Sequence, residues 1–119
     1  HCTSLGMKLN VEKYYNLADF IILPSSFGEG FSNVLVEGML SELYPIATNV
    51  GDAKTIIGKT GLIIPKAEEK YFIQVLKKIF KTKKNIIFNS GRASRKRAIE
   101  LFSSVKMKNS YENLYKGVL

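Results

Sequence analysis

The stretch Glu29-Gly-Phe-Ser-Asn-Val-Leu-Val-Glu37 decides the fold of this 119-residue chain. A glutamate stands in a glycine-flanked loop, and Ser32 and Asn33, both good helix N-cap residues, open an apolar run that leads to a second glutamate. Just upstream, Asp19-Phe-Ile-Ile-Leu-Pro24 is a short apolar run closed by proline, which predicts a buried strand. The order is strand, glycine loop and helix N-terminus, which suits an anion because the first helical amides are unpaired.

The two glutamates frame this expected anion site. A helix that begins near Ser32 places Glu37 in its second turn, while Glu29 stays in the loop before the helix. The carboxylates then lie on the order of 10 Å apart along the helix axis. Helical side chains lean toward the N-terminus, so Glu37 is expected to reach back toward the ligand. Three free amides are expected between the carboxylates, those of Asn33, Val34 and Leu35. The alternative is that Ser32 caps the helix through the Leu35 amide, which leaves fewer donors for an anion. The pattern predicts a ligand with a hydroxyl-rich group at each end and a diphosphate in the middle, as in a nucleotide sugar.

Short apolar runs alternate with helical periodicities along the chain, which predicts an α/β fold with a parallel sheet. The expected strands cover 20–23, 46–48 and 62–64, and the expected helices besides the motif helix cover 11–17, 53–57, 67–82, 86–102 and 104–117. Asp52 is expected to cap the 53–57 helix and Gly58 to stop it, with Ser103 or Ser104 as the last N-cap. Three strands make half of a doubly wound sheet, whose ligands bind outside the carboxyl ends of the strands.

Blocks in a fixed order carry a family resemblance. They are Tyr14-Tyr-Asn-Leu-Ala-Asp19, Leu23-Pro-Ser-Ser-Phe-Gly-Glu-Gly-Phe31, the E-x7-E pair Glu29 and Glu37, Pro45-Ile-Ala-Thr-Asn-Val-Gly51, Thr60-Gly-Leu-Ile-Ile-Pro65, and the closing Leu101-Phe-Ser103 and Tyr111-Glu-Asn-Leu-Tyr115. Together they resemble the C-terminal half of the donor-binding domain of retaining glycosyltransferases of family four (glycosyl transferases group 1), which have the GT-B fold. An isolated E-x7-E is common by chance, whereas collinear blocks at matching distances are specific.

The resemblance implies a fold and an activity. The fold is the C-terminal half of a doubly wound, Rossmann-like parallel-sheet domain closed by C-terminal helices. Residues 1–119 form a single partial domain, and the acceptor domain is expected to lie outside the chain. The activity is retaining transfer of a sugar from a nucleotide-sugar donor to a glycan or lipid-linked acceptor, with no metal or other cofactor. This chain alone is expected to be inactive, because the acceptor side and the family's basic pair for the diphosphate lie upstream.

The resemblance also implies roles for single residues. Glu29, the expected catalytic residue, contacts hydroxyls of the donor sugar, and Glu37 binds the ribose hydroxyls of the nucleotide. The amides around Gly30 to Asn33 touch the diphosphate. The implied donor-binding set is Glu29, Gly30, Phe31, Ser32, Asn33, Val34 and Glu37.

One segment departs from the family pattern. After the second glutamate the family usually has A-M-A-x-G-x-P, whereas Gly38-Met-Leu-Ser-Glu-Leu-Tyr-Pro45 lacks the internal glycine and is one residue longer. The helix is therefore expected to end differently, without a glycine in a left-handed C-cap. The departure concerns the helix-to-strand turn and leaves the ligand end untouched.

The net charge of +8 is concentrated between Lys66 and Lys108, where 13 lysines and arginines face three glutamates. The favoured interpretation is two amphipathic helices with an apolar stripe on the sheet and a solvated basic face. In the first, Phe72, Val75, Leu76, Ile79 and Phe80 form the stripe opposite Lys77, Lys78 and Lys81. In the second, Arg92, Arg95, Lys96 and Arg97 flank Ala98, Ile99 and Phe102. Peripheral attraction to an anionic membrane is the alternative. Nucleic acid is not an expected partner, since no reader motif accompanies the charge.

Composition indicates a globular class, with 45% hydrophobic residues. No run has the length of a transmembrane helix and no signal-peptide pattern is present, so a cytoplasmic location is expected, with peripheral association at the inner face of the membrane as an option. The single cysteine, Cys2, fits a reducing compartment, and neither it nor His1 has partner ligands that indicate a metal site. The chain does not begin with methionine, and we expect it to be part of a longer protein.

Two other functions compete with the transferase. A nucleotide-sugar epimerase of the GT-B architecture would use the same cleft, but no matching acid/base set is visible. A non-catalytic module that docks on membrane or nucleic acid through basic helices would bind with a steep salt dependence. The intact pair Glu29 and Glu37 argues against the module.

Overall fold

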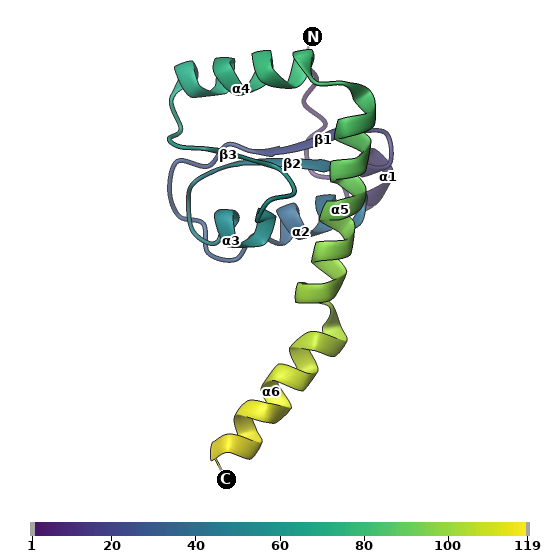
Figure 1. The fold of residues 1–119 in the computed structure, drawn as a ribbon, viewed down its shortest axis with the longest axis vertical. Coiled ribbons are helices and arrows are strands. Elements are labelled where there is room, and N and C mark those ends of the chain that lie inside the picture. The colour runs from purple at the N-terminus through teal and green to yellow at the C-terminus, as the bar shows by residue number, and fades with distance from the viewer. Residues whose placement is uncertain (1, 119) are drawn as a thin grey trace.

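The computed structural model describes residues 2–118, so His1 lies outside the described part. It contains a parallel sheet with the order β1 (Phe20–Leu23), β2 (Tyr44–Thr48), β3 (Leu62–Ile64) (Figure 1). The helices are α1 (Glu12–Tyr15), α2 (Asn33–Leu40), α3 (Ala53–Ile57), α4 (Glu69–Lys81), α5 (Lys84–Phe102) and α6 (Ser104–Val118). The α/β class and every expected element are confirmed. No helix within residues 2–118 has the length and apolar character needed to cross a membrane.

Apolar side chains cover both faces of the sheet, since alternate residues of a strand point to opposite faces. On one face, Leu35 and Met39 of α2 and residues of α3 and α5 pack with Ile21. On the other face, Ile79 of α4 packs with Ile46 and neighbours on β3. Figure 1 shows this layering, with α4 on one side of the sheet and α2 and α3 on the other. Helices on both faces are the arrangement of a doubly wound sheet.

Strand β1 is less buried than its sequence predicts. Ile21 is buried beneath α2, but Ile22 on the α4 face is 43% exposed. The expectation of a buried strand is therefore wrong for this face. The reason is that β1 lies at the edge of the sheet and α4 packs over β3, at the opposite edge.

The expected apolar stripe of α4 is confirmed only in part. Phe72, Val75 and Ile79 pack on the sheet, but Leu76 is 40% exposed and Phe80 is 84% exposed. The expectation is wrong for these two residues, because they lie on a part of α4 that the described residues leave uncovered.

Helix α2 ends in a left-handed turn although no glycine is present. Glu42 has φ 62°, the amide of Leu43 donates to Gly38 O (3.1 Å), and the amide of Glu42 donates to Met39 O (3.1 Å). These two bonds define a Schellman motif. No glycine caps the helix, as expected, but the expectation that the helix therefore ends differently is wrong, because Glu42 adopts the conformation that a glycine would adopt at lower cost.

Helix α5 packs closely on this turn. A Cβ atom on Gly91 would overlap Glu42 O, so a glycine is required at the crossing. Ser94 Oγ, buried, donates to Leu43 O (3.0 Å), and Arg95 donates to Leu40 O (3.0 Å). The last carbonyls of a helix lack partners within it, so Arg95 completes the end of α2, while Ser94 binds the turn that follows α2.

Arg97 acts in the same way on α3. Its guanidinium donates to Ile56 O (2.9 Å) and Thr55 O (2.6 Å), beside the C-cap Gly58 at φ 59°. The interpretation of α5 as an apolar stripe with a solvated basic face is therefore wrong in part. Its buried residues are the small Gly91, Ser94 and Ala98, while Ile99 is 48% exposed. Of the four basic residues Arg92, Arg95, Lys96 and Arg97, two donate hydrogen bonds to carbonyls at helix ends instead of facing only solvent.

The expected caps of the other helices have mixed outcomes. Gly58 ends α3 with positive φ as expected, but the side chain of Asp52 makes no capping hydrogen bond. Ser103 Oγ accepts from the amide of Lys106 (3.3 Å), which confirms Ser103 as the cap of α6. Helix α6 then projects away from the sheet (Figure 1).

We predict that Glu42→Gly stabilises the protein by about 1 kcal/mol, because glycine adopts positive φ without the steric cost of a Cβ atom. Glu42→Ala is the matched control, since it removes the same charge but keeps the Cβ atom. The measurement is the free energy of unfolding by urea at equilibrium. Equal stability of the two variants would show that the left-handed turn carries no strain.

Candidate functional site

Two loops meet at the carboxyl ends of the strands. The loop 24–32 follows β1, and the loop 49–52 follows β2. Buried Thr48 donates its hydroxyl to the carbonyls of Leu23 (3.4 Å) and Ser25, and the amide of Asp52 lies 3.4 Å from Gly30 O. The candidate loop is therefore held against its neighbour at the edge of the sheet where such folds bind ligands.

The N-terminus of α2 keeps two open amides. Ser32 is the N-cap, and its hydroxyl accepts from the amide of Leu35 (3.4 Å). The expectation of a free Leu35 amide is therefore wrong, because the cap serine occupies it. The amides of Asn33 and Val34 have no protein acceptor among residues 2–118. They remain as donors for an anion at the positive end of the helix dipole.

The carboxylate of Glu29 is held by a side chain from its own loop. Glu29 is partly buried, and Ser25 Oγ donates to its Oε1 at 2.6 Å. A hydroxyl–carboxylate bond of this length is among the stronger side-chain hydrogen bonds. One carboxylate oxygen is thus engaged, and the other keeps its capacity to accept from a ligand hydroxyl.

The carboxylate of Glu37 is held from a different element. Glu37 is exposed on α2, and the phenol of Tyr15 on α1 donates to its Oε2 at 3.4 Å. Burial, and after it the charge and hydrogen bond of Glu37, raise the pKa of Tyr15 above its ordinary value of 10.0. The phenol therefore stays protonated at neutral pH and acts as the donor.

Glycines shape the candidate loop. Gly28 (φ 77°) and Gly51 (φ 54°) both have left-handed backbones. A Cβ atom on Gly51 would overlap Glu29 O and come within 2.8 Å of Gly30 O, whereas one on Gly28 would meet nothing within 4 Å. Gly51 therefore permits the close approach of the second loop, while Gly28 serves only the turn.

The side chain of Phe31 has a structural contact. Its ring packs edge-to-face on Phe102 of α5, with centroids 5.2 Å apart. Aromatic pairs of this geometry contribute about 0.5–1.5 kcal/mol beyond their buried area. Phe31 thus anchors the loop to the end of α5, and its expected donor contact rests on its backbone amide.

Sequence reasoning placed the two glutamates but missed the groups that hold them. Ser25, Tyr15 and Thr48 lie in blocks that carry the resemblance, yet no role was assigned to their hydroxyls. The one sequence feature that could have indicated a role for these hydroxyls was their position in those blocks. The hydroxyls of Tyr15 and Thr48 reach acceptors in distant segments of the chain, whereas Ser25 reaches Glu29 within one loop.

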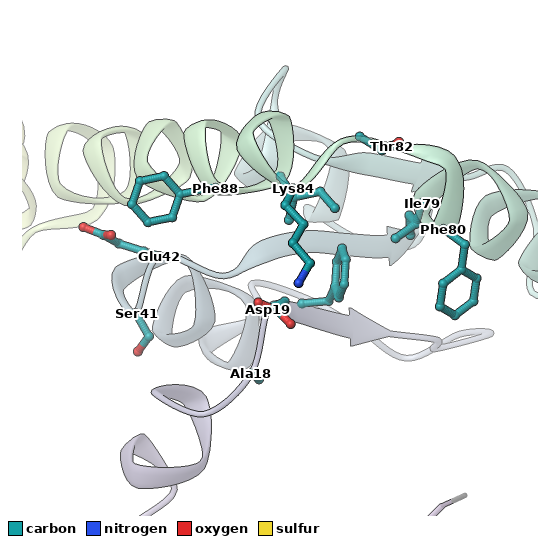
Figure 2. Close-up of a pocket in the computed structure, with 11 residues that line it drawn as sticks. Ala18, Asp19, Ser41, Glu42, Ile79, Phe80, Thr82, Lys84 and Phe88 are labelled. Atoms are coloured by element: carbon teal, nitrogen blue, oxygen red, sulfur yellow. The ribbon is translucent and has the colours of Figure 1, made fainter.

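A cavity of about 570 Å³ lies at the other end of the strands (Figure 2). Its lining includes Asp19 at the start of β1, Glu42 at the end of α2, and Phe80 and Phe88. Figure 2 shows Lys84 directed toward Asp19. The negative end of the α2 dipole lies here, which is unfavourable for a diphosphate. This cavity is therefore not the donor site.

No group of three His, Cys, Asp or Glu side chains within the described residues could hold a metal ion. The expected reaction without a metal stays a prediction.

Residues 1–82 match the model of the family described as glycosyl transferases group 1. The chain belongs to this family. A curated relative, the capsular polysaccharide biosynthesis glycosyltransferase CapM of Staphylococcus aureus, is 31% identical over 108 residues, which are 89% of this chain and 28% of CapM. The family assignment confirms the resemblance on which the residue roles rest.

Two solved structures share the fold. A glycosyltransferase from Rickettsia africae aligns with a TM-score of 0.81 and 24% identity, over 93% of this chain and 30% of that protein. A sucrose-phosphate synthase from Thermosynechococcus elongatus aligns with a TM-score of 0.75 and 24% identity, over 90% of this chain and 28% of that protein. The chain therefore has the α/β fold of this part of the GT-B glycosyltransferases and spans less than a third of the length of these proteins.

We predict that Gly51→Ala destabilises the protein by about 1–3 kcal/mol more than Gly28→Ala does. Both variants place a Cβ atom on a left-handed residue, but only the one at Gly51 meets the backbone that carries Glu29. The difference in unfolding free energy isolates this contact from backbone strain. Equal losses in the two variants would show that the loops do not depend on their close approach.

Proposed function

We propose that this chain supplies the donor-binding part of a retaining glycosyltransferase, which moves a sugar from a nucleotide-sugar donor to a glycan or lipid-linked acceptor. One observation carries the proposal. Two open amides stand at the start of α2, with Glu29 in the loop before the helix and Glu37 in its second turn, and each carboxylate is held by a hydroxyl. A diphosphate flanked by two hydroxyl-rich groups matches this order of donors and acceptors.

Each part of the donor has a proposed contact. The amides of Asn33 and Val34 donate to the diphosphate, where the helix dipole favours negative charge. Glu29 accepts from hydroxyls of the transferred sugar, and Glu37 accepts from the ribose hydroxyls. An ionised carboxylate is a pure acceptor, so it suits a pair of neighbouring hydroxyls better than a neutral amide does.

The same groups have a role in the proposed reaction. The bond from the anomeric carbon to the diphosphate oxygen breaks, a bond to an acceptor oxygen forms on the same face of the sugar, and the proton of the acceptor hydroxyl passes to the departing diphosphate. Negative charge grows on the departing diphosphate. Donors already aimed at that charge stabilise the transition state, and such stabilisation is usually the largest catalytic contribution. The open amides of α2 supply part of it, and no metal is required in this proposal.

The remainder of the domain has a proposed position. An exposed apolar surface, composed of Ile22, Ile73, Leu76 and Phe80 (84% exposed), lies on the α4 side of the sheet, and Phe80 lines the cavity in Figure 2. We propose that the other half of the doubly wound domain covers this surface and pairs with the edge of β1. This explanation is preferred to membrane insertion, because the open edge of β1 adjoins the surface. The unpaired backbone groups of such an edge can pair with a further strand of the same sheet.

The relative CapM takes part in capsular polysaccharide biosynthesis, as its name states. The proposed acceptor class is accordingly a growing glycan or its lipid-linked form, and the proposed location is the cytoplasm at the inner face of the membrane. The excess of basic residues from Lys66 to Lys108 is compatible with an anionic surface.

We predict that Glu37→Ala in the full-length protein weakens donor binding by about 1.5–3 kcal/mol, the range for hydrogen bonds to a charged group. A panel of nucleotide sugars is first screened by thermal shift, since a ligand at 100 times its dissociation constant stabilises by about 2.7 kcal/mol. The affinity of the best donor is then measured by calorimetry.

The matched control for this measurement is Glu42→Ala, which removes an exposed glutamate just past the other end of α2. It should leave donor affinity unchanged. Unchanged affinity in Glu37→Ala would contradict the proposed ribose contact. Product formed from the donor without any acceptor would favour the epimerase over the transferase.

A further inference from the structure

We propose that Ser25 and Tyr15 are positioning residues that hold the two carboxylates separately, Ser25 at the sugar end of the donor and Tyr15 at the nucleotide end. This inference rests on the proposed function and deepens it. It predicts that the two ends of the donor site can be weakened one at a time by removing a single hydroxyl.

Ser25 is placed to hold Glu29 by contacts on both of its sides. Its hydroxyl donates to Glu29 Oε1 at 2.6 Å. Its carbonyl accepts from the hydroxyl of Thr48, which is 1% exposed at the end of β2. The sheet therefore fixes the backbone of Ser25, and Ser25 fixes the carboxylate. Glu29 lies in a glycine-flanked loop, where its side chain would otherwise sample several rotamers.

Tyr15 is placed to hold Glu37 from the end of α1. Its ring packs against the apolar cluster beneath α2, and its phenol donates to Glu37 Oε2 at 3.4 Å. Its raised pKa keeps the phenol protonated at neutral pH. The adjacent Tyr14 is 38% exposed and is not part of that cluster, so α1 carries one tyrosine that contacts Glu37 and one that does not.

The two holding contacts share no residue. Ser25 reaches Glu29 within the loop after β1, while Tyr15 reaches Glu37 from α1. Each contact occupies one carboxylate oxygen and leaves the other able to accept from a ligand hydroxyl. Holding a binding group in its bound conformation raises affinity by reducing the entropy lost on binding. Each hydroxyl should therefore affect only the end of the donor that its carboxylate contacts.

The test compares Ser25→Ala and Tyr15→Phe with the matched controls Ser26→Ala and Tyr14→Phe in the full-length enzyme. Two quantities are measured for each, the KM for the nucleotide sugar and the inhibition constant of the free nucleoside diphosphate. The free nucleoside diphosphate contains the ribose but lacks the sugar that is transferred. Ser25→Ala should raise the KM about three- to tenfold and leave the inhibition constant unchanged, while Tyr15→Phe should raise both by about the same factor.

A double-mutant comparison tests whether Ser25 acts through Glu29. Once Glu29→Ala has removed the carboxylate, adding Ser25→Ala should change the dissociation constant of the nucleotide sugar, measured by calorimetry, by less than about twofold. An additive effect would overturn the positioning role of Ser25. So would a rise in both quantities for Ser25→Ala, because a general loosening of the fold would weaken both ends together.

Failure of this inference is distinguishable from failure of the proposed function. If the wild-type enzyme transfers sugar and Ser25→Ala and Tyr15→Phe behave like their controls, only the positioning roles are wrong. If the wild-type enzyme binds no nucleotide sugar in the panel, the proposed function is wrong and the positioning roles fall with it.

Discussion

The candidate site depends on the contact between the two loops that leave the carboxyl ends of β1 and β2. Thr48 donates to the carbonyls of Leu23 and Ser25, and Gly51 packs directly on the backbone of Glu29. The Gly51 contact leaves no room for a Cβ atom. A loop rich in glycine and serine would otherwise lose much conformational entropy on binding a ligand. Here that entropy is lost on folding, so the loop is preorganised.

Helix α5 stabilises the same site from behind. Its small residues allow a close approach to the end of α2. Arg95 and Arg97 donate hydrogen bonds to carbonyls at the ends of α2 and α3, and Ser94 donates to a carbonyl in the turn after α2. Phe102 at the end of the helix contacts Phe31 in the candidate loop. One helix thus joins the C-terminal end of α2 to the loop at its N-terminal end. The basic charge of α5 is in part structural, which weakens the argument that it exists to attract a membrane or nucleic acid.

Much of the secondary structure could be predicted from the sequence, because the periodicity of apolar residues and the cap residues are local signals. Ser32 and Gly58 lie at the expected ends of α2 and α3. The errors arose where distant segments decide the outcome. The exposure of Ile22 depends on which helix covers the strand, and the role of Arg97 depends on a carbonyl 41 residues away. The Glu42 turn was missed because a non-glycine residue there is disfavoured locally and is tolerated only through packing.

The sequence by itself determined the order of strands and helices, the family, and the two glutamates of the expected donor site, since these follow from residue type and spacing along the chain. Only the tertiary structure decided which amides of α2 stay open, and which hydroxyls hold Glu29 and Glu37. The physical reason is that a hydrogen bond depends on distance and angle between atoms. Tyr15 and Thr48 meet their acceptors only after the sheet has brought separate segments together, and Ser25 meets Glu29 only in the folded conformation of their shared loop.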